Sequence, residues 1–246
     1  MEERLTKKEL REKRRLEFTK QEEAQERTEK VKKIAIWAGV ALLLIGSVWG
    51  LFKLANKPSL TSSQTEIVKA PPLTQEDITK GNKDAKIVLI EYSDFQCPAC
   101  GYYYPIAKQL TEEYKDKILF AYRFFPLRQI HQNAMSSSQA AYAAHLQGKF
   151  WEMHDMLFES QKDWSESSDA KDIFISYAKK LNLNEEQFKK DMESDEALRV
   201  INNQYSAGAQ AGINSTPTFF LNGVKIQNPQ TYEAFKSLIE SKLKTQ

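Results

Sequence analysis

Cysteine and histidine are scarce in this chain of 246 residues, which has two of the former and three of the latter. Both cysteines, Cys97 and Cys100, stand in a single Cys-Pro-Ala-Cys turn. A structural zinc site takes four ligands and the chain has no second cysteine pair, so zinc binding is disfavoured. Haem attachment is excluded, because Gly101 and not histidine follows the second cysteine. No metal site is therefore predicted.

An excess of charge of either sign is also lacking, with 35 basic against 33 acidic residues. Residues 1–33 hold 12 of the basic and 9 of the acidic residues, which leaves a net charge of −1 for the rest of the chain. This balance gives no electrostatic reason to bind nucleic acid. Within residues 1–33 opposite charges recur four positions apart and few residues are apolar. We therefore expect a solvated, partly helical cytoplasmic tail, whose role stays open.

A stretch without charge follows this tail, at residues 34–52. At a rise of about 1.5 Å per residue, a helix of this length can cross a hydrocarbon core of about 30 Å. Lysines lie directly before it, which favours an N-terminus in the cytoplasm. A cleaved signal peptide is the alternative, but the preceding segment is long for one and no small-residue cleavage site follows. Residues 53–80, polar and containing three prolines, are predicted to be a flexible tether.

The cysteine turn comes after an apolar segment, 86–92, that is typical of a buried strand, and before a segment typical of a helix. Cysteines three positions apart can close a disulfide, and a helix N-terminus stabilises a thiolate. We therefore expect Cys97 to be the exposed nucleophile and Cys100 to be the shielded, resolving thiol. Pro98 fits the first helical turn, where a missing amide costs little. A passive disulfide clip is the alternative, although so small a ring removes little unfolded-state entropy.

Strand and helix patterns along residues 81–246 predict one α/β domain. A helix is predicted from 97 to about 114, kinked or divided at Pro105, and a buried strand from 118 to 125. Strand, helix and strand in this order favour parallel pairing. A helical block follows at about 131–211, with helices expected at 133–147, 150–159, 169–181, 185–192 and 196–211. The Asn-Gly pair at 222–223 then predicts a hairpin of strands 218–221 and 224–226, before a last helix at about 231–243.

Three motifs together resemble the DsbA-like family of thioredoxin-fold thiol-disulfide oxidoreductases, in a membrane-tethered bacterial form. They are Phe95–Cys100, Gly148–Asp155 and Gly212–Gly223. The resemblance covers about residues 81–246 and implies a thioredoxin-like fold with the helical block as an insertion. It further implies that Thr216 and Pro217 form a loop with a cis peptide bond, which faces the cysteines and presents its backbone to a substrate strand. Thr216 would lie close to the sulfurs and tune their thiolate character.

Other positions near the cysteines are candidates for setting the redox properties. Strongly oxidising members of the family carry histidine where this chain has Ala99, so Pro98 and Ala99 are expected to tune the potential. Glu91 lies on an otherwise apolar strand, and the family has an acid at the matching place. It is a candidate proton acceptor for Cys100, and the alternative is that it points to solvent. The three histidines, His131, His145 and His154, are expected to be structural or surface residues.

The expected function is that of a membrane-anchored thiol-disulfide oxidoreductase, which donates the Cys97–Cys100 disulfide to reduced or unfolded proteins outside the cytoplasm. Thiol-disulfide exchange itself needs no dissociable cofactor. As the resemblance implies, a partner oxidase in the membrane would reoxidise the enzyme. Two alternatives stay open. One is a reductase or isomerase with the same fold, and the other is a non-enzymatic, membrane-tethered protein-binding module.

Overall fold

The structure, a computed structural model, describes residues 68–245 and seven separate positions between 32 and 47. The chain divides into two units, residues 1–64 and 65–246. Nearly all of the predicted tail, most of the predicted membrane span and the first part of the predicted tether lie outside the described residues. Within the described part of the chain, no helix has both the length and the apolar character needed to cross a membrane.

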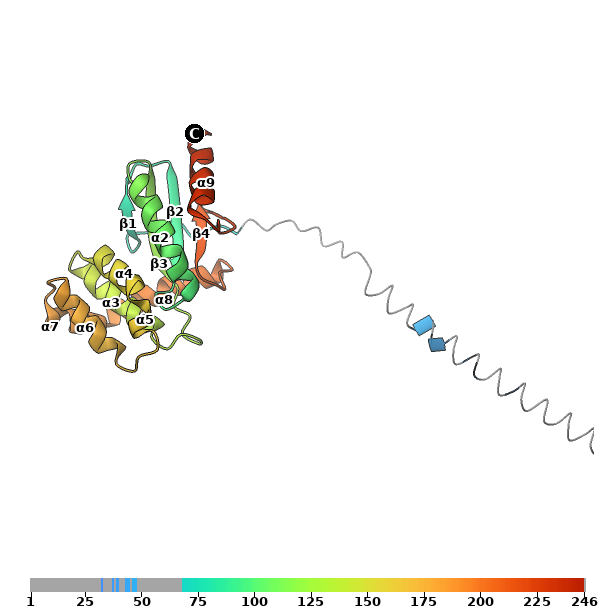
Figure 1. The fold of residues 1–246 in the computed structure, drawn as a ribbon, viewed down its shortest axis with the longest axis horizontal. Coiled ribbons are helices and arrows are strands. Elements are labelled where there is room, and N and C mark those ends of the chain that lie inside the picture. The colour runs from blue at the N-terminus through green and yellow to red at the C-terminus, as the bar shows by residue number, and fades with distance from the viewer. Residues whose placement is uncertain are drawn as a thin grey trace, which may run out of the picture. The chain divides into compact units, whose positions relative to one another are not determined.

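A five-stranded mixed sheet forms the centre of the second unit, in the order β1-β3-β2-β4-β5 (Figure 1). Its strands are β1 Ile78–Gly81, β2 Ile87–Ser93, β3 Ile118–Phe124, β4 Thr218–Leu221 and β5 Val224–Lys225. Strands β2 and β3 run parallel and are joined by helix α2, Pro98–Glu113, whereas the other pairs are antiparallel. Parallel neighbours need such a crossover connection, and the predicted strand-helix-strand unit is confirmed.

The predicted helical block between β3 and β4 is present, and Figure 1 shows its helices gathered at one end of the sheet. They are α3 Ala134–Leu146, α4 Phe150–Glu159, α5 Gln161–Trp164, α6 Ala170–Lys180, α7 Glu185–Met192 and α8 Asp195–Gln210. Each of the five helices expected in this block ends within one residue of its predicted position, and only the short α5 was not expected. The last helix, α9 Tyr232–Lys244, packs against α2 and β2.

Both faces of the sheet are buried, and the alternation of side chains along the strands sorts them into two layers. One face carries Leu89 and Tyr122 and packs with Cys100 of α2 into the larger core. The opposite face carries Ile90 and Phe220 in a smaller core. Strands buried on both sides have nearly continuous apolar sequences, which is why β2 and β3 could be recognised.

Helix α2 is continuous through Pro105, so of the two predicted effects of this proline, a kink or a division, the division is wrong and the kink stays a prediction. A proline inside a helix removes one backbone hydrogen bond. Pro105 itself is exposed, however, while Tyr104 and Ala107 on either side of it are buried. The packing of these neighbours holds the helix together across the missing bond.

The prediction that the tether ends at residue 80 needs correction, because β1 belongs to the sheet. Ile78–Gly81 pairs with β3, and Lys69 forms a bridge with Val224 at the opposite edge. The Ala70 amide also donates to the Gly223 carbonyl, at 2.9 Å. A four-residue edge strand has no marked sequence pattern, and its place is decided by the unpaired backbone groups of the strand beside it.

A buried ion pair fastens this first segment to β3. Arg123 Nε and Asp77 Oδ1 lie 2.5 Å apart, and the two side chains are 4% and 2% exposed. The same guanidinium donates to the carbonyls of Pro71 and Pro72 and to the Tyr92 hydroxyl. Charges as deeply buried as these are tolerated only while each retains its partner.

Removing one partner of the pair should therefore destabilise the folded unit. Asp77→Asn leaves the Arg123 charge buried without a counter-ion, and we expect a loss of about 3–5 kcal/mol in the free energy of unfolding. Arg199→Gln is the matched control, because the ion pair of Arg199 with Glu76 is exposed, and such pairs contribute less than about 1 kcal/mol. Urea unfolding followed by circular dichroism measures both losses. Equal losses would contradict the role given to the buried pair.

Candidate active site

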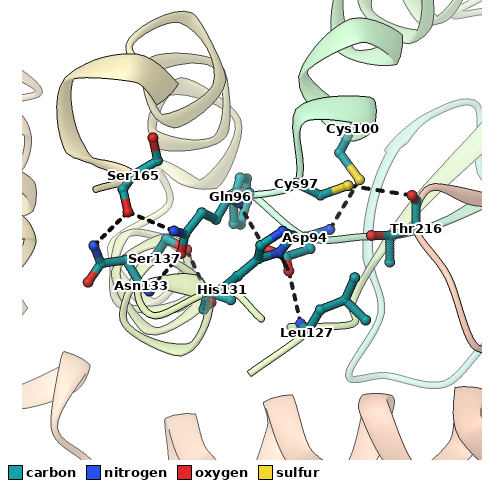
Figure 2. Close-up of polar contacts among 12 residues, drawn as sticks. Asp94, Gln96, Cys97, Cys100, Leu127, His131, Asn133, Ser137, Ser165 and Thr216 are labelled. Atoms are coloured by element: carbon teal, nitrogen blue, oxygen red, sulfur yellow. Dashed lines mark hydrogen bonds and ion pairs between the residues drawn. The ribbon is translucent and has the colours of Figure 1, made fainter. Parts of the chain in front are cut away.

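The two cysteines lie where the chain leaves β2 and enters α2 (Figure 2). Cys97 is the N-cap residue of the helix, and Pro98 is the first helical residue. The Cys97 Sγ lies 3.5 Å from the Thr216 carbonyl oxygen. One turn further on, the Cys100 Sγ accepts a hydrogen bond from the Asp94 amide, also at 3.5 Å. Both cysteines are free thiols.

The prediction that Cys97 is an exposed thiol is wrong, although Cys97 is the less buried of the two cysteines. Cys97 is 7% exposed and Cys100 is fully buried, so the first cysteine is nearly covered and not open to solvent. The loop that contains Thr216 lies against it and accounts for part of this cover. Pro98 and Ala99, in contrast, are exposed. A side chain at position 99 can therefore face an approaching substrate, and alanine adds no charge there.

The thiols differ strongly in acidity. The pKa of Cys97 is lowered to about 5, chiefly because the Cys100 thiol donates a hydrogen bond to its sulfur. The Thr216 side chain and backbone amides at the helix start lower it further, against the effect of burial. The pKa of Cys100 is raised well above its ordinary value, first by burial and then by the Cys97 sulfur and Glu91. At neutral pH the pair is thus a thiolate beside a thiol.

The peptide bond between Thr216 and Pro217 is cis, and its loop faces the cysteines. Strand β4 begins at the next residue and pairs with β2, which holds the loop in register with the cysteine turn. The Thr216 hydroxyl is buried and has no hydrogen-bond partner among the described residues. A donor in this position can bond to the Cys97 sulfur once that thiol has ionised.

Glu91 is buried, with 3% exposure, so the alternative that it points to solvent is wrong. Burial raises the pKa of its carboxyl to about 7, and the Ser93 hydroxyl and the Lys80 charge offset part of this rise. The Glu91 charge in turn raises the pKa of Cys100, so the two groups are in electrostatic contact. A carboxyl that titrates near neutral pH can accept a proton from the buried thiol and return it.

A buried carboxylate that the sequence did not reveal organises the turn. Asp94 is fully buried, and its Oδ1 accepts a hydrogen bond from the Gln96 amide at 2.8 Å. Its Oδ2 accepts another from the Leu127 amide at 2.9 Å and lies 2.7 Å from Nδ1 of His131 (Figure 2). Asp94 therefore ties the cysteine turn to the loop after β3. His131, which was expected to be a structural or surface residue, helps to hold Asp94 in place beside the site.

The helical insertion supports the turn from another side. The Gln161 amide of α5 donates to the carbonyls of Phe95 and Cys97, at 2.7 and 3.0 Å. Gly101 leaves space for this contact, because a Cβ atom there would lie 2.8 Å from the Gln161 side-chain oxygen. No sequence pattern marks Gln161 as part of the site, since it lies on a short helix far along the chain.

The two remaining histidines pack in the insertion. His154 is buried, its Nδ1 lies 2.9 Å from an oxygen of Asp155, and its ring stands edge-on to Tyr122. His145 packs against Tyr142. Among the residues that the structure describes, no three histidine, cysteine or acidic side chains are grouped in a way that could hold a metal ion.

Comparisons with known proteins support the fold. A family model described as thioredoxin matches residues 73–241. The crystal structure of oxidised BdbD from Bacillus subtilis aligns with a TM-score of 0.64 and 21% identity, covering 72% of this chain and 98% of that one. A thioredoxin-like oxidoreductase from Silicibacter pomeroyi aligns with a TM-score of 0.58 and 22% identity, covering 70% and 94%. The predicted thioredoxin-like fold with a helical insertion is confirmed.

A relative of another kind matches only in part. The Na+/H+ antiporter NhaA 3 of Salinispora tropica is 28% identical over 215 residues, which are 82% of this chain but 32% of that protein. This chain thus spans about a third of the length of the antiporter it matches. The similarity is to one part of that protein, so its transport activity is not carried over to this chain.

The difference in acidity predicts how the reduced thiols react with iodoacetamide. Cys97 should be alkylated with a midpoint near pH 5, whereas Cys100 should stay unlabelled through neutral pH because burial keeps it protonated. Ala99→His should lower the Cys97 midpoint, because an imidazolium beside a thiolate stabilises its charge. Ala99→Gln is the uncharged control. Peptide mapping over a pH series measures each site, and equal labelling of both cysteines would contradict these roles.

Proposed function

This chain belongs to the thioredoxin family, and from that premise we propose that it is a thiol-disulfide oxidoreductase that donates the Cys97–Cys100 disulfide to reduced proteins outside the cytoplasm. The observation that supports this best is the split in acidity between two adjacent sulfurs, one with a pKa of about 5 and the other raised well above its ordinary value. A passive disulfide clip has no need for such a split.

In the donating direction, a substrate thiolate attacks the Cys97 sulfur of the disulfide, and the electron pair of the broken S–S bond goes to Cys100. Cys100 then takes up a proton, because burial disfavours its thiolate. A second substrate thiolate attacks the substrate sulfur that is bonded to Cys97, and Cys97 leaves as a thiolate. The substrate gains a disulfide and the enzyme is left with two reduced cysteines.

The acidity of Cys97 favours this direction. A thiol of low pKa is a good leaving group, and a stabilised thiolate makes the reduced enzyme more stable relative to its disulfide. Its reduced form is the product of disulfide donation. Ala99 lacks the charge that a histidine would add to this effect, so we place this enzyme among the milder oxidants.

The surface around the cysteines suits an unfolded polypeptide as substrate. A pocket beside the Thr216 loop is lined by Leu127, Arg128, Gln129, Ile130, Tyr205 and Asn214. Ile130 is 73% exposed in this pocket, and Tyr102 on α2 is 56% exposed. We assign these two side chains as the contacts for apolar segments of a substrate. The backbone of the cis loop would then pair with the substrate strand.

The proposed location is the cell membrane, with a single span at residues 34–52 and the folded unit outside the cytoplasm. Support comes from the absence of charge in that segment and from the lysines before it. Each donated disulfide leaves two thiols in the enzyme, so a turnover needs an electron acceptor. We assign this role to a partner oxidase in the same membrane.

Two other functions are compatible with the fold. A reductase or isomerase would run the same exchange from the dithiol form and would have a more negative potential. A tethered binding module would use the apolar surface alone and would not need the cysteines. The redox potential separates the first from the proposed function, and a cysteine variant separates the second.

We expect the oxidised enzyme to form a disulfide in a reduced, unfolded protein with two cysteines and to be left reduced. Its potential against glutathione should be less negative than about −180 mV, the value of protein disulfide isomerase, whereas a value near about −270 mV would indicate a reductase like thioredoxin. Cys97→Ser should abolish the exchange, because no mixed disulfide can form. If this variant retained the function in cells, the chain would be a binding module.

The proposed topology has a test of its own. Protease added to spheroplasts should remove the folded unit and leave residues 1–33 protected, because the membrane separates the two. An epitope tag at each end of the chain, read by immunoblot, reports both parts, and lysed cells are the control in which both are cut. Protection of the folded unit in intact spheroplasts would reverse the topology.

A further inference from the structure

Two buried hydroxyls beside the redox pair have no part in the exchange described above. The Ser93 Oγ and the Tyr122 OH are inaccessible to solvent, and neither has a hydrogen-bond partner among the described residues. An unpaired buried hydroxyl destabilises the folded state, so a folded protein has few of them. Their position next to the thiols suggests that the cost serves the chemistry.

Strand register brings both hydroxyls to one side of the sheet. Glu91 and Ser93 are two residues apart on β2 and so point to the same face. Tyr122 on β3 is the direct partner of Glu91, so its side chain lies on that face too. Cys100 is buried in the same core as Tyr122. The two hydroxyls thus share a dry layer with the buried acid and the buried thiol.

The charges in this layer act on one another. Burial raises the pKa of the Tyr122 hydroxyl well above its ordinary value, and a negative charge on Glu91 or Cys100 raises it further, so the hydroxyl stays protonated at neutral pH. The Ser93 hydroxyl is close enough to Glu91 and Tyr122 to lower the pKa of each as a potential hydrogen-bond donor, although no such bond is formed in this structure. The two hydroxyls are therefore coupled to both groups whose proton content changes during the reaction and share their face of the sheet.

We propose that the Tyr122 and Ser93 hydroxyls carry the proton that Cys100 and Glu91 exchange in each redox cycle. This inference rests on the proposed function. When the disulfide is donated, the Cys100 thiolate accepts a proton from a hydroxyl, and that hydroxyl regains one from the Glu91 carboxylic acid. When the disulfide is formed again, Cys100 gives up its proton by the same route and its thiolate attacks the Cys97 sulfur. The hydroxyls are unchanged at the end of either step.

Besides Tyr122 and Cys100, the titratable groups close to this layer are Lys80 of β1, His154 of α4 and Asp94 after β2. These three are less suited to the transfer. His154 is held neutral by burial and is bonded to Asp155. The Lys80 ammonium lies 4.6 Å from the centre of the Trp151 ring. Asp94 is occupied by donors from the turn and from the loop after β3.

The step to measure is closure of the mixed disulfide between Cys97 and glutathione, because it requires Cys100 to lose its proton. Reduced enzyme is mixed with oxidised glutathione, quenched in acid at intervals, and analysed by mass spectrometry. In the wild type the closure rate should rise with pH through a midpoint near 7, where Glu91 becomes able to accept a proton. The sign follows from the chemistry, since only the ionised carboxylate is a base.

In Tyr122→Phe and in Ser93→Ala the mixed disulfide should last at least about tenfold longer near neutral pH, and the midpoint should move upward, because general acid-base groups contribute about 10²- to 10⁴-fold. The alkylation midpoint of Cys97 should stay unchanged in both variants. Tyr142→Phe is the matched control, since it removes a tyrosine hydroxyl that is bonded at 3.3 Å to Glu196, on the insertion.

Tyr122→Phe should be no less stable than the wild type, because the hydroxyl it removes has no partner. Unchanged closure rates in both variants at every pH, with normal formation of the mixed disulfide, would overturn the proton route and leave the proposed function intact. A wild type that forms no mixed disulfide would overturn the proposed function and this inference together.

Discussion

The burial of Cys100 against the sheet is the constraint on which the chemistry of the site depends. A thiol removed from water stays protonated, and only a protonated Cys100 can donate a hydrogen bond to the Cys97 sulfur. That bond is the largest cause of the acidity of Cys97. The reactive thiolate therefore exists because its neighbour cannot ionise. A single placement, one helical turn below the N-cap, produces both properties.

The same constraint creates a need for a proton carrier. A disulfide cannot form or break without a change in the proton content of Cys100, which is fully buried in a core that contains many aromatic rings. Phe95 stacks on Tyr122 with ring centres 5.1 Å apart and packs against Phe158 at 5.0 Å. The layer admits a carboxyl only with a raised pKa, and Glu91 meets that condition. Because burial prevents Cys100 from exchanging its proton with water, the exchange requires an acid inside the protein.

Much of this arrangement could be predicted from local sequence, since it rests on short-range patterns. The apolar runs of β2 and β3, the helical segments of the insertion and the turn at Asn222 and Gly223 follow from periodicity and turn chemistry. The β1 strand could not be predicted, because its extended conformation depends on pairing with β3 and not on a pattern in its own four residues. Asp94 and Gln161 act through partners more than thirty positions away, which no local pattern records. Tyr122 looks like any aromatic residue of a buried strand until the register places it opposite Glu91.

The helical insertion changes what the site can accept. The β2–α2 unit supplies the two sulfurs, but the carbonyls of the turn are held by Gln161 of the insertion, and Asp94 is held by the loop that leads into it. These contacts fix the cysteine turn without using the helix start, so the backbone amides there remain available to the thiolate. The cis loop lies against Cys97 on the other side, and only 7% of this residue is exposed to solvent. A folded surface cannot reach so small an opening, whereas an extended chain lying along the loop can bring a cysteine to it. The cover that protects the thiolate is therefore consistent with the unfolded substrates of the proposed function.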